Sequence, residues 1–229
     1  HQEAVRCGQR DVLCGRPEGA ASAHHPSCPS FRLRALGQRI VGRLPRRLRL
    51  AQAPVEPDMV ANQEHQTGEA FKELLAASYK QPFVIDADAL NILADNYHIK
   101  QRVPENSILT PHPGELKRLV GEWHNEEEKI SLVRRYAANM KSIIIVKGAH
   151  TMICLPDGNC YFNSTGNSGM AKGGSGDLLT GYITGLLARG YSSDHAAILG
   201  VYTHGLAGDK AAAKWGIESM NSKDIIDFL

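Results

Sequence analysis

The sequence predicts an α/β fold in which a mainly parallel sheet is layered with helices. From Phe83 onward, short apolar runs alternate with longer segments whose apolar residues recur at helical spacing. Residues 143–146 form a continuous β-branched run, Ile-Ile-Ile-Val, which is typical of a strand buried on both faces of a parallel sheet. Both observations concern the same part of the chain, so we expect its folded core there.

The composition is that of a globular domain. The chain has 229 residues, of which 42% are hydrophobic and 22% charged, and its net charge of +2 is too small to indicate nucleic-acid binding. No run approaches the roughly 18 apolar residues of a spanning helix, and no secretory signal opens the chain. We therefore expect no nucleic-acid or membrane partner and a cytoplasmic location, and we leave open whether the protein is a homo-oligomer.

Residues 1–66 differ in character from the rest. Residues 1–71 hold ten Arg and no Lys, whereas residues 72–229 hold eleven Lys and five Arg. The apolar residues of the first segment follow no sustained period. A disordered basic arm, an Arg-rich targeting peptide and a segment outside the native reading frame are alternatives, and the abrupt change from Arg to Lys favours the last. We predict that residues 1–66 contribute no native structure and that residues 67–229 form the folded domain.

The cysteines do not predict a metal site. The spacings of the N-terminal cysteines and histidines miss the CxxC patterns of structural zinc sites, which excludes zinc at Cys7, Cys14, Cys28, His24 and His25. Cys154 and Cys160 flank a turn at residues 156–159, and we expect both to be reduced residues of a β-hairpin.

The first predicted elements each lead to a possible ligand site. Residues 68–80 carry apolar side chains on one helical face and end before Pro82. A strand at residues 83–85 follows, with Asp86 and Asp88 at its carboxyl end, which is where α/β proteins place their ligands.

A second strand, at residues 107–109, leads into a loop stiffened by two prolines. The loop covers residues 110–114 and a helix opens on Glu115, so His112 is held on a rigid turn at the end of a strand. A lone histidine in a turn is more often solvated than functional.

Periodicity and turn residues predict the remaining elements. We expect a helix with a charged face at residues 126–141, the buried strand at 143–146 and a hairpin at 151–155 with 159–163. A helix with a small-residue face follows at residues 193–214, and a last helix at 223–229 is capped by Ser222. Lys147 directly follows the buried strand. It is either an edge charge or a point charge that reaches a phosphate.

A glycine-rich loop leads into an amphipathic helix that starts at Gly176 or Asp177 and stops at Gly190. Five glycines let the loop adopt positive φ and approach a ligand closely: Gly166, Gly169, Gly173, Gly174 and Gly176. The free amides of the first helical turn and the positive end of the helix dipole favour an anion. We predict this anion hole at Gly173, Gly174, Ser175 and Gly176.

Asp177 lies at the start of this helix and has two interpretations. Its carboxylate either caps the helix, or faces the pocket and takes a proton from a substrate hydroxyl. A cap needs none of the five preceding glycines, so their presence favours the second interpretation.

The segment TGNSGMAKGGSGDLLTG resembles the GxGD anion hole of the ribokinase-like superfamily. Over its full length it is similar to the ADP/ATP-dependent NAD(P)H-hydrate dehydratase family, whose members repair hydrated nicotinamide cofactor. The resemblance covers about residues 67–229 and is most specific at residues 83–95, 107–119 and 147–190. It implies the ribokinase-like layered fold. The family's first strand, Gly-rich turn and GPGLG-type loop are not found in residues 1–66.

The resemblance also implies a mechanism and its residues. ATP or ADP phosphorylates the hydroxyl of the hydrated nicotinamide ring, and the phosphate then leaves to restore the double bond. Asp177 accepts the proton of the hydroxyl, the anion-hole amides hold the transferring phosphoryl group, and Mg²⁺ bridges nucleotide oxygens. His112 of the HPGE motif contacts the hydrated NADH or NADPH, and the nucleotide binds to Lys147, Gly148, Ala149, His150, Thr151, Asn167 and Gly176.

Two alternatives stay open. A kinase of a small alcohol, such as a thiazole, hydroxymethyl-pyrimidine or sugar kinase, shares the GxGD chemistry. The HPGE and KGAHT segments favour the dehydratase. The absent N-terminal strands support an incomplete domain that binds nucleotide without turning it over.

Overall fold

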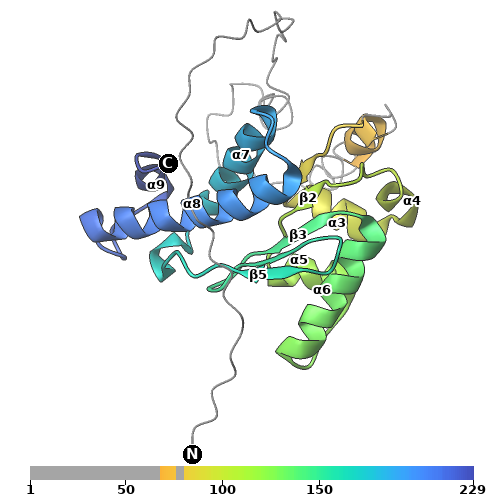
Figure 1. The fold of residues 1–229 in the computed structure, drawn as a ribbon, viewed down its shortest axis with the longest axis horizontal. Helices are drawn as coiled ribbons and strands as arrows, with labels where there is room; N and C mark the ends of the chain where they lie inside the picture. Colours follow the sequence, from red (N-terminus) through yellow and green to blue (C-terminus); the bar gives the residue numbers. More distant parts are fainter. Residues whose placement is uncertain (1–67, 76–79) are drawn as a thin grey trace, which may run out of the picture. The chain divides into compact units, whose positions relative to one another are not determined.

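A five-stranded sheet organises the part of the chain that the structure, a computed structural model, describes: residues 68–75 and 80–229 (Figure 1). The strands are β1 (Val84–Ile85), β2 (Ile108–Leu109), β3 (Ile143–Val146), β4 (Met152–Cys154) and β5 (Cys160–Phe162), and they lie in that order. The predictions for residues 1–66, including their lack of native structure, lie outside the described residues and stay predictions.

The sheet is mainly parallel, as predicted. β1 pairs with β2 and β2 with β3 in parallel, whereas β3 with β4 and β4 with β5 pair antiparallel. Two successive antiparallel pairings return β5 to the direction of β3, so β4 alone of the five runs the opposite way. Cys154 faces Cys160 across the β4–β5 hairpin, and both are free thiols, as expected.

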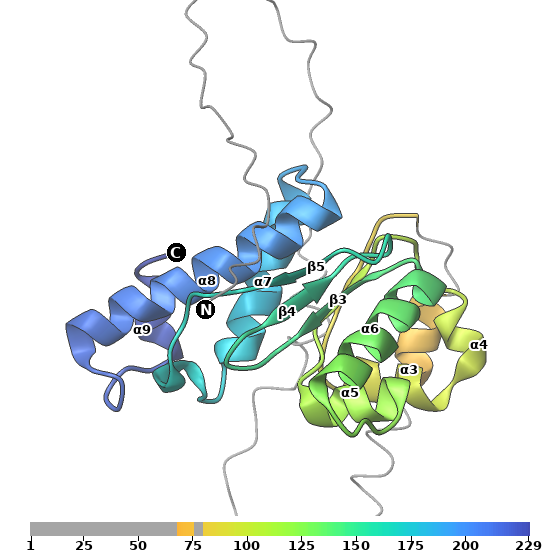
Figure 2. The same cartoon turned by 60° about the horizontal axis from the view of Figure 1, so that its bottom comes forward.

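One face of the sheet is covered by α3 (Asp88–Asp95), α5 (Pro113–Val120) and α6 (Glu126–Met140), and the other by α7 (Ser175–Ala188) and α8 (Ser193–Trp215). Successive residues of β3 point to opposite faces, so Ile144 packs with Leu90, Leu116 and Val133, while Ile145 packs with α7 and α8. Figure 2 shows these helices on the two sides of the strands. The continuous apolar run of β3 is thus explained by burial on both faces, and the layered α/β prediction is confirmed.

The prediction placed most elements within a few residues of their observed bounds. Residues 68–75 are helical and residues 76–79 lie outside the described part. α5 begins at Pro113 rather than Glu115, because the His112 side chain caps the helix and Pro113 is its first residue. α7 begins at Ser175, slightly earlier than expected, and Gly190, with φ of 90°, lies just beyond its end as predicted.

Three short elements were missed and one cap was wrong. α3, α4 (Tyr97–Lys100) and the 3₁₀ helix η1 (Ser168–Met170) were not predicted. The last helix, α9 (Ser222–Ile226), ends before Leu229. Its N-cap is Asn221 rather than Ser222, because the Asn221 side chain accepts from the Lys223 amide while Asp224 accepts from the Asn221 amide. Among the described residues, no helix is long and apolar enough to cross a membrane.

Candidate active site

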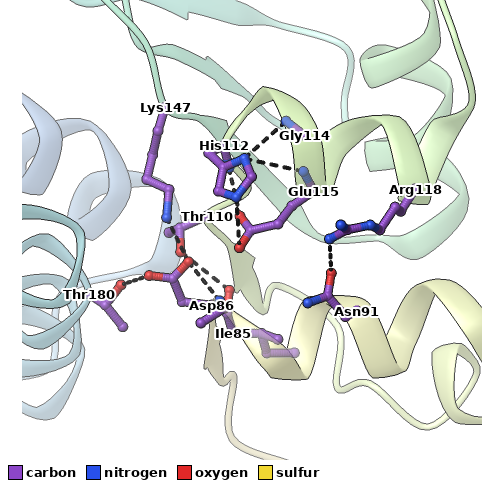
Figure 3. Close-up of polar contacts among 11 residues, drawn as sticks. Ile85, Asp86, Asn91, Thr110, His112, Gly114, Glu115, Arg118, Lys147 and Thr180 are labelled. Atoms are coloured by element: carbon purple, nitrogen blue, oxygen red, sulfur yellow. Dashed lines mark hydrogen bonds and ion pairs between the residues drawn. The ribbon is translucent and has the colours of Figure 1, made fainter. Parts of the chain in front are cut away.

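An ion pair joins the carboxyl ends of two parallel strands to the glycine-rich helix. Asp86 directly follows β1 and Lys147 directly follows β3, so the parallel arrangement brings both to one edge of the sheet. Lys147 Nζ donates to Asp86 Oδ1 at 2.7 Å, and the hydroxyl of Thr180, in α7, donates to Asp86 Oδ2 at 2.9 Å (Figure 3). The side chains of Asp86 and Lys147 are 12% and 23% exposed, so this pair is largely shielded from solvent.

The first turn of α7 lies against this ion pair. A Cβ on Gly176 would be 3.5 Å from Lys147 Nζ and 3.9 Å from Asp86 Oδ2. The structure therefore brings together Lys147 and Gly176, two of the predicted nucleotide-binding residues. Asp86 also belongs to this group. The sequence analysis placed it at the end of a strand but assigned it no role.

The start of α7 has the form expected of an anion site. Its N-cap is Gly174, whose φ of 87° favours glycine, and no side chain caps it. The Leu178 amide donates to the Gly174 carbonyl at 3.0 Å, so the amides of Gly176 and Asp177 precede the helix's own hydrogen-bond ladder. The Ser175 amide donates to the Lys172 carbonyl at 3.3 Å, which makes it a poorer candidate for binding an anion than its two successors.

Asp177 does not cap the helix, so the first interpretation of this residue is wrong. The N-cap is three residues earlier, and the Asp177 carboxylate is exposed in the first turn. Asp177 has no hydrogen-bond or ion-pair partner within the described ranges. Its side chain is thus accessible to a ligand.

His112 caps α5 through a capping box. Its Nδ1 accepts from the amides of Gly114 and Glu115 at 2.9 and 3.3 Å, and Glu115 Oε2 accepts from the His112 amide at 2.8 Å. Because Nδ1 is an acceptor, the neutral ring carries its proton on Nε2, which lies 3.4 Å from Glu115 Oε1. The side chain is 54% exposed, so the ring is accessible to a ligand. The Pro111 carbonyl accepts from the Lys147 amide at 2.9 Å, which anchors this turn to the end of β3.

Asn167 is held by α8 rather than by the ion pair. Its amide group donates to Asp209 Oδ1 at 3.0 Å, and the Gly166 amide donates to Asp209 Oδ2 at 2.9 Å. Residues 148–150 form an exposed turn closed by Thr151, whose hydroxyl donates to the Gly148 carbonyl at 3.1 Å. The described contacts do not join Asn167 or this turn directly to Asp86 or Lys147.

Lys172 and Ser222 hold the glycine-rich loop from the C-terminal side. Lys172 Nζ donates to the Glu218 carbonyl at 2.6 Å, and Ser222 Oγ donates to the Gly173 carbonyl at 2.7 Å. The Lys172 ammonium therefore serves to anchor the loop to the segment before α9.

A buried histidine lies behind the start of α7. His204, in α8, is 7% exposed and hydrogen-bonded to the backbone of Ser175, and burial lowers its pKa to about 4. Its Nε2 has no partner within the part of the chain that the structure describes. The ring is neutral near pH 7 and adds no charge to the anion site.

The sequence analysis missed Thr180 and Asp209. Thr180 had a recognisable signal, because it lies four residues after Gly176 and so on the same helical face. Asp209 had none, because its partners precede it by more than forty residues.

Comparisons with known proteins identify the family of this arrangement. A family model described as NAD(P)H-hydrate dehydratase matches residues 61–229. The bifunctional NAD(P)H-hydrate repair enzyme of Moorella thermoacetica is 44% identical over 165 residues, which cover 71% of this chain and 31% of the relative. The ADP-dependent (S)-NAD(P)H-hydrate dehydratase of Bacillus subtilis is 37% identical over 150 residues, covering 65% and 52%. The chain thus spans about a third to a half of the length of these relatives.

Solved structures agree in fold. The Bacillus subtilis ADP/ATP-dependent NAD(P)H-hydrate dehydratase, co-crystallised with ATP and Mg²⁺, is similar with a TM-score of 0.62 and 32% identity, covering 72% of this chain and 57% of that chain. A ribokinase-like superfamily protein from Enterococcus faecalis gives a TM-score of 0.62 at 30% identity, covering 71% and 56%. The ribokinase-like prediction is confirmed, and the family and relative names favour the dehydratase over the small-alcohol kinase.

Proposed function

The chain belongs to the NAD(P)H-hydrate dehydratase family, and from that membership we propose that it catalyses the nucleotide-dependent dehydration of hydrated NADH and NADPH. One observation supports this most directly: the Lys147 ammonium lies against the first turn of α7, where helix amides remain available. A cation and free amides at one point are what a transferring phosphoryl group requires.

The reaction has two steps. In the first, Asp177 accepts the proton of the ring hydroxyl as the hydroxyl oxygen attacks the terminal phosphorus of ATP or ADP, and the nucleotide leaves one phosphate shorter. In the second, the carbon–oxygen bond of the phosphorylated ring breaks, inorganic phosphate leaves with the bonding electrons, and loss of a ring proton restores the double bond. The amides of Gly176 and Asp177 stabilise charge on the phosphoryl oxygens in the first step.

The other predicted residues keep their proposed roles. Lys147 binds nucleotide phosphate together with the anion hole at residues 173–176. Residues 148–151 and Asn167 contact the rest of the nucleotide, and the accessible ring of His112 contacts the substrate. The accessibility of Asp177 and His112 supports these assignments.

A divalent cation fits the site as part of the nucleotide. Within the described residues there is no group of three or more His, Cys, Asp or Glu that could hold a metal by itself. Mg²⁺ is usually bound by phosphates with one or two carboxylates, and there it neutralises charge on the phosphoryl group. Mg²⁺ bound together with ATP or ADP would supply this charge neutralisation beside Lys147 and the first turn of α7.

We propose a cytoplasmic location, which is what the composition of the chain led us to expect. Whether the protein forms a homo-oligomer can be determined by light scattering.

Turnover of hydrated NADH tests the proposed function. The full chain is mixed with hydrated NADH, Mg²⁺ and either ATP or ADP, and the return of the NADH absorbance band is followed together with phosphate release. We expect both signals in equal amounts and neither without nucleotide. A stable phosphorylated alcohol would favour the small-alcohol kinase, and nucleotide binding without turnover would favour the incomplete domain.

A further inference from the structure

We propose that Asp86 is a positioning residue, which holds the Lys147 ammonium against the first turn of α7 so that the ammonium meets a nucleotide phosphate there. The inference rests on the proposed nucleotide binding, and it assigns a role to a residue for which the sequence provided none.

Both oxygens of the Asp86 carboxylate are used within the protein. Oδ1 accepts from Lys147 Nζ at 2.7 Å and from the Ala87 amide at 2.9 Å, while Oδ2 accepts from the Thr180 hydroxyl at 2.9 Å (Figure 3). Three donors from three segments of the chain therefore fix the plane of the carboxylate. Charge-assisted hydrogen bonds in a shielded site are stronger than their exposed counterparts.

The arrangement leaves Lys147 able to bind a ligand. An ammonium has three donors, and Asp86 is its one side-chain partner among the described residues. Gly176 has no side chain, so nothing on this residue separates the ammonium from the start of the helix. A Cβ at this position would be only 3.5 Å from Lys147 Nζ. Asp86 thus fixes where the ammonium lies without using all of its donors.

The backbone beside Asp86 is in a conformation that is rare outside glycine. Ala87 has φ of 53° and ψ of −129°, and in this conformation its amide reaches Asp86 Oδ1. Such strain persists where the surrounding structure fixes it, and it occurs preferentially at functional sites. Ala87 is a second, independent observation that this corner of the fold is built around the Asp86 carboxylate.

An ordinary surface ion pair offers a matched comparison. Lys141 Nζ lies 2.6 Å from Glu105 Oε1, but both side chains are 66% exposed. Surface pairs of this kind hold their partners weakly. If Asp86 acts by position, its removal should change Lys147 far more than the removal of Glu105 changes Lys141.

The first measurement needs no ligand. The full chain is treated with acetic anhydride, and acetylation rates at individual lysines are read by mass spectrometry. We expect Asp86→Asn to raise the rate at Lys147 at least about threefold while leaving Lys141 unchanged, because loss of the charge-assisted hydrogen bond frees the Lys147 side chain to meet the reagent. Glu105→Gln should leave Lys147 unchanged. An unchanged Lys147 rate in Asp86→Asn would overturn the proposal.

The second measurement is a double-mutant cycle on nucleotide affinity by calorimetry, with ATP and ADP as probes. We expect Asp86→Asn to weaken nucleotide binding about five-fold in the wild-type background. In the Lys147→Met background the same substitution should weaken it less than about two-fold, since Asp86 acts through the ammonium. Thr180→Val should weaken binding about two-fold, and Thr180→Ser should restore it. Thermal melts check that each variant is folded.

The outcomes separate the two proposals. Equal losses in both backgrounds, or tighter binding in Asp86→Asn, would show that Asp86 does not position Lys147. A wild-type chain that binds neither nucleotide, yet shows the acetylation change, would refute the proposed function and leave the positioning role standing.

Discussion

Adding one methyl group at Gly205 should destabilise the protein and loosen the loop that carries Asn167. Gly205 lies in α8 against Thr165, and a Cβ there would be 2.2 Å from Thr165 Oγ1, 2.8 Å from its carbonyl carbon and 2.9 Å from its carbonyl oxygen. The hydroxyl can rotate away, but the backbone atoms cannot. The loop would have to retreat by about half an ångström to reach ordinary contact distances, as in other overpacked interfaces.

The expected cost has two parts. Overpacking costs about 1–3 kcal/mol. Rotation of Thr165 also breaks its 2.9 Å hydrogen bond to the Tyr202 carbonyl, which adds about 1 kcal/mol. We therefore expect Gly205→Ala to lose about 2–4 kcal/mol of unfolding free energy, which in a domain of this size lowers Tm by roughly 5–15 °C. Because the displaced loop includes Asn167, nucleotide affinity should fall as well.

Gly181→Ala is the matched control for this substitution. Gly181 lies inside α7, and a Cβ there would meet nothing within 4 Å. Replacing an open helical glycine by alanine should stabilise the protein by about 0.5–1 kcal/mol. Thermal and urea unfolding of the two variants, followed by circular dichroism, measures both effects. If Gly205→Ala were as stable as Gly181→Ala, the close approach of Thr165 to α8 could not be rigid.

Three further predictions concern charge and protonation. Asp177→Asn should lower turnover by about 10²–10⁴-fold, since it removes a base, while calorimetric nucleotide affinity stays within a few-fold; an equal loss of affinity would make Asp177 structural. Lys147→Ala should raise the nucleotide KM more than it lowers kcat in steady-state kinetics, because a phosphate point charge contributes mainly uniform binding, and an unchanged KM would remove it from the site. His204 titrates near pH 4 when folded and near 6.5 when unfolded, so the unfolded state binds the proton first and stability should fall by up to about 3 kcal/mol as the pH drops from 6.5 to 4. Urea unfolding at several pH values checks this, and His204→Gln should flatten the dependence.

Local sequence patterns predicted the elements in which the order of apolar and charged residues reflects which faces are buried. β3 is apolar at every position because both of its faces are covered, and the charged face of α6 is visible directly in the sequence. α3 was missed because only two residues separate it from β1, so no loop signal marks where the strand ends and the helix begins. The cap of α9 depended on a choice between Asn221 and Ser222, two residues that cap equally well by propensity.

The site residues could be predicted only where they lie close together in one sequence motif. The glycines and Asp177 lie within one short segment, so a helix start and its accessible carboxylate could be inferred from spacing. Asp86 meets Lys147 across 61 residues and Thr180 across 94. No local pattern encodes such a contact, because the packing of the sheet against α7 decides which strand-end carboxylate lies beside which helix turn.

The contacts that hold the glycine-rich loop share one property that bears on its function. Ser222 binds the carbonyl of Gly173, Lys172 binds carbonyls of the segment before α9, and Asp209 binds the amide of Gly166. These contacts use carbonyl groups, or amides well before the helix, and they leave the amides of Gly176 and Asp177 unused. A loop that must present those amides to an anion cannot also be anchored by them, so its rigidity has to come from elsewhere. In this chain the rigidity of the loop comes from α8 and from the residues that lead into α9. These residues follow the loop in sequence, whereas Asp86 and Lys147 precede it. Substitutions at Asp209 or Ser222 should therefore weaken anion binding although neither residue lies in the predicted anion hole.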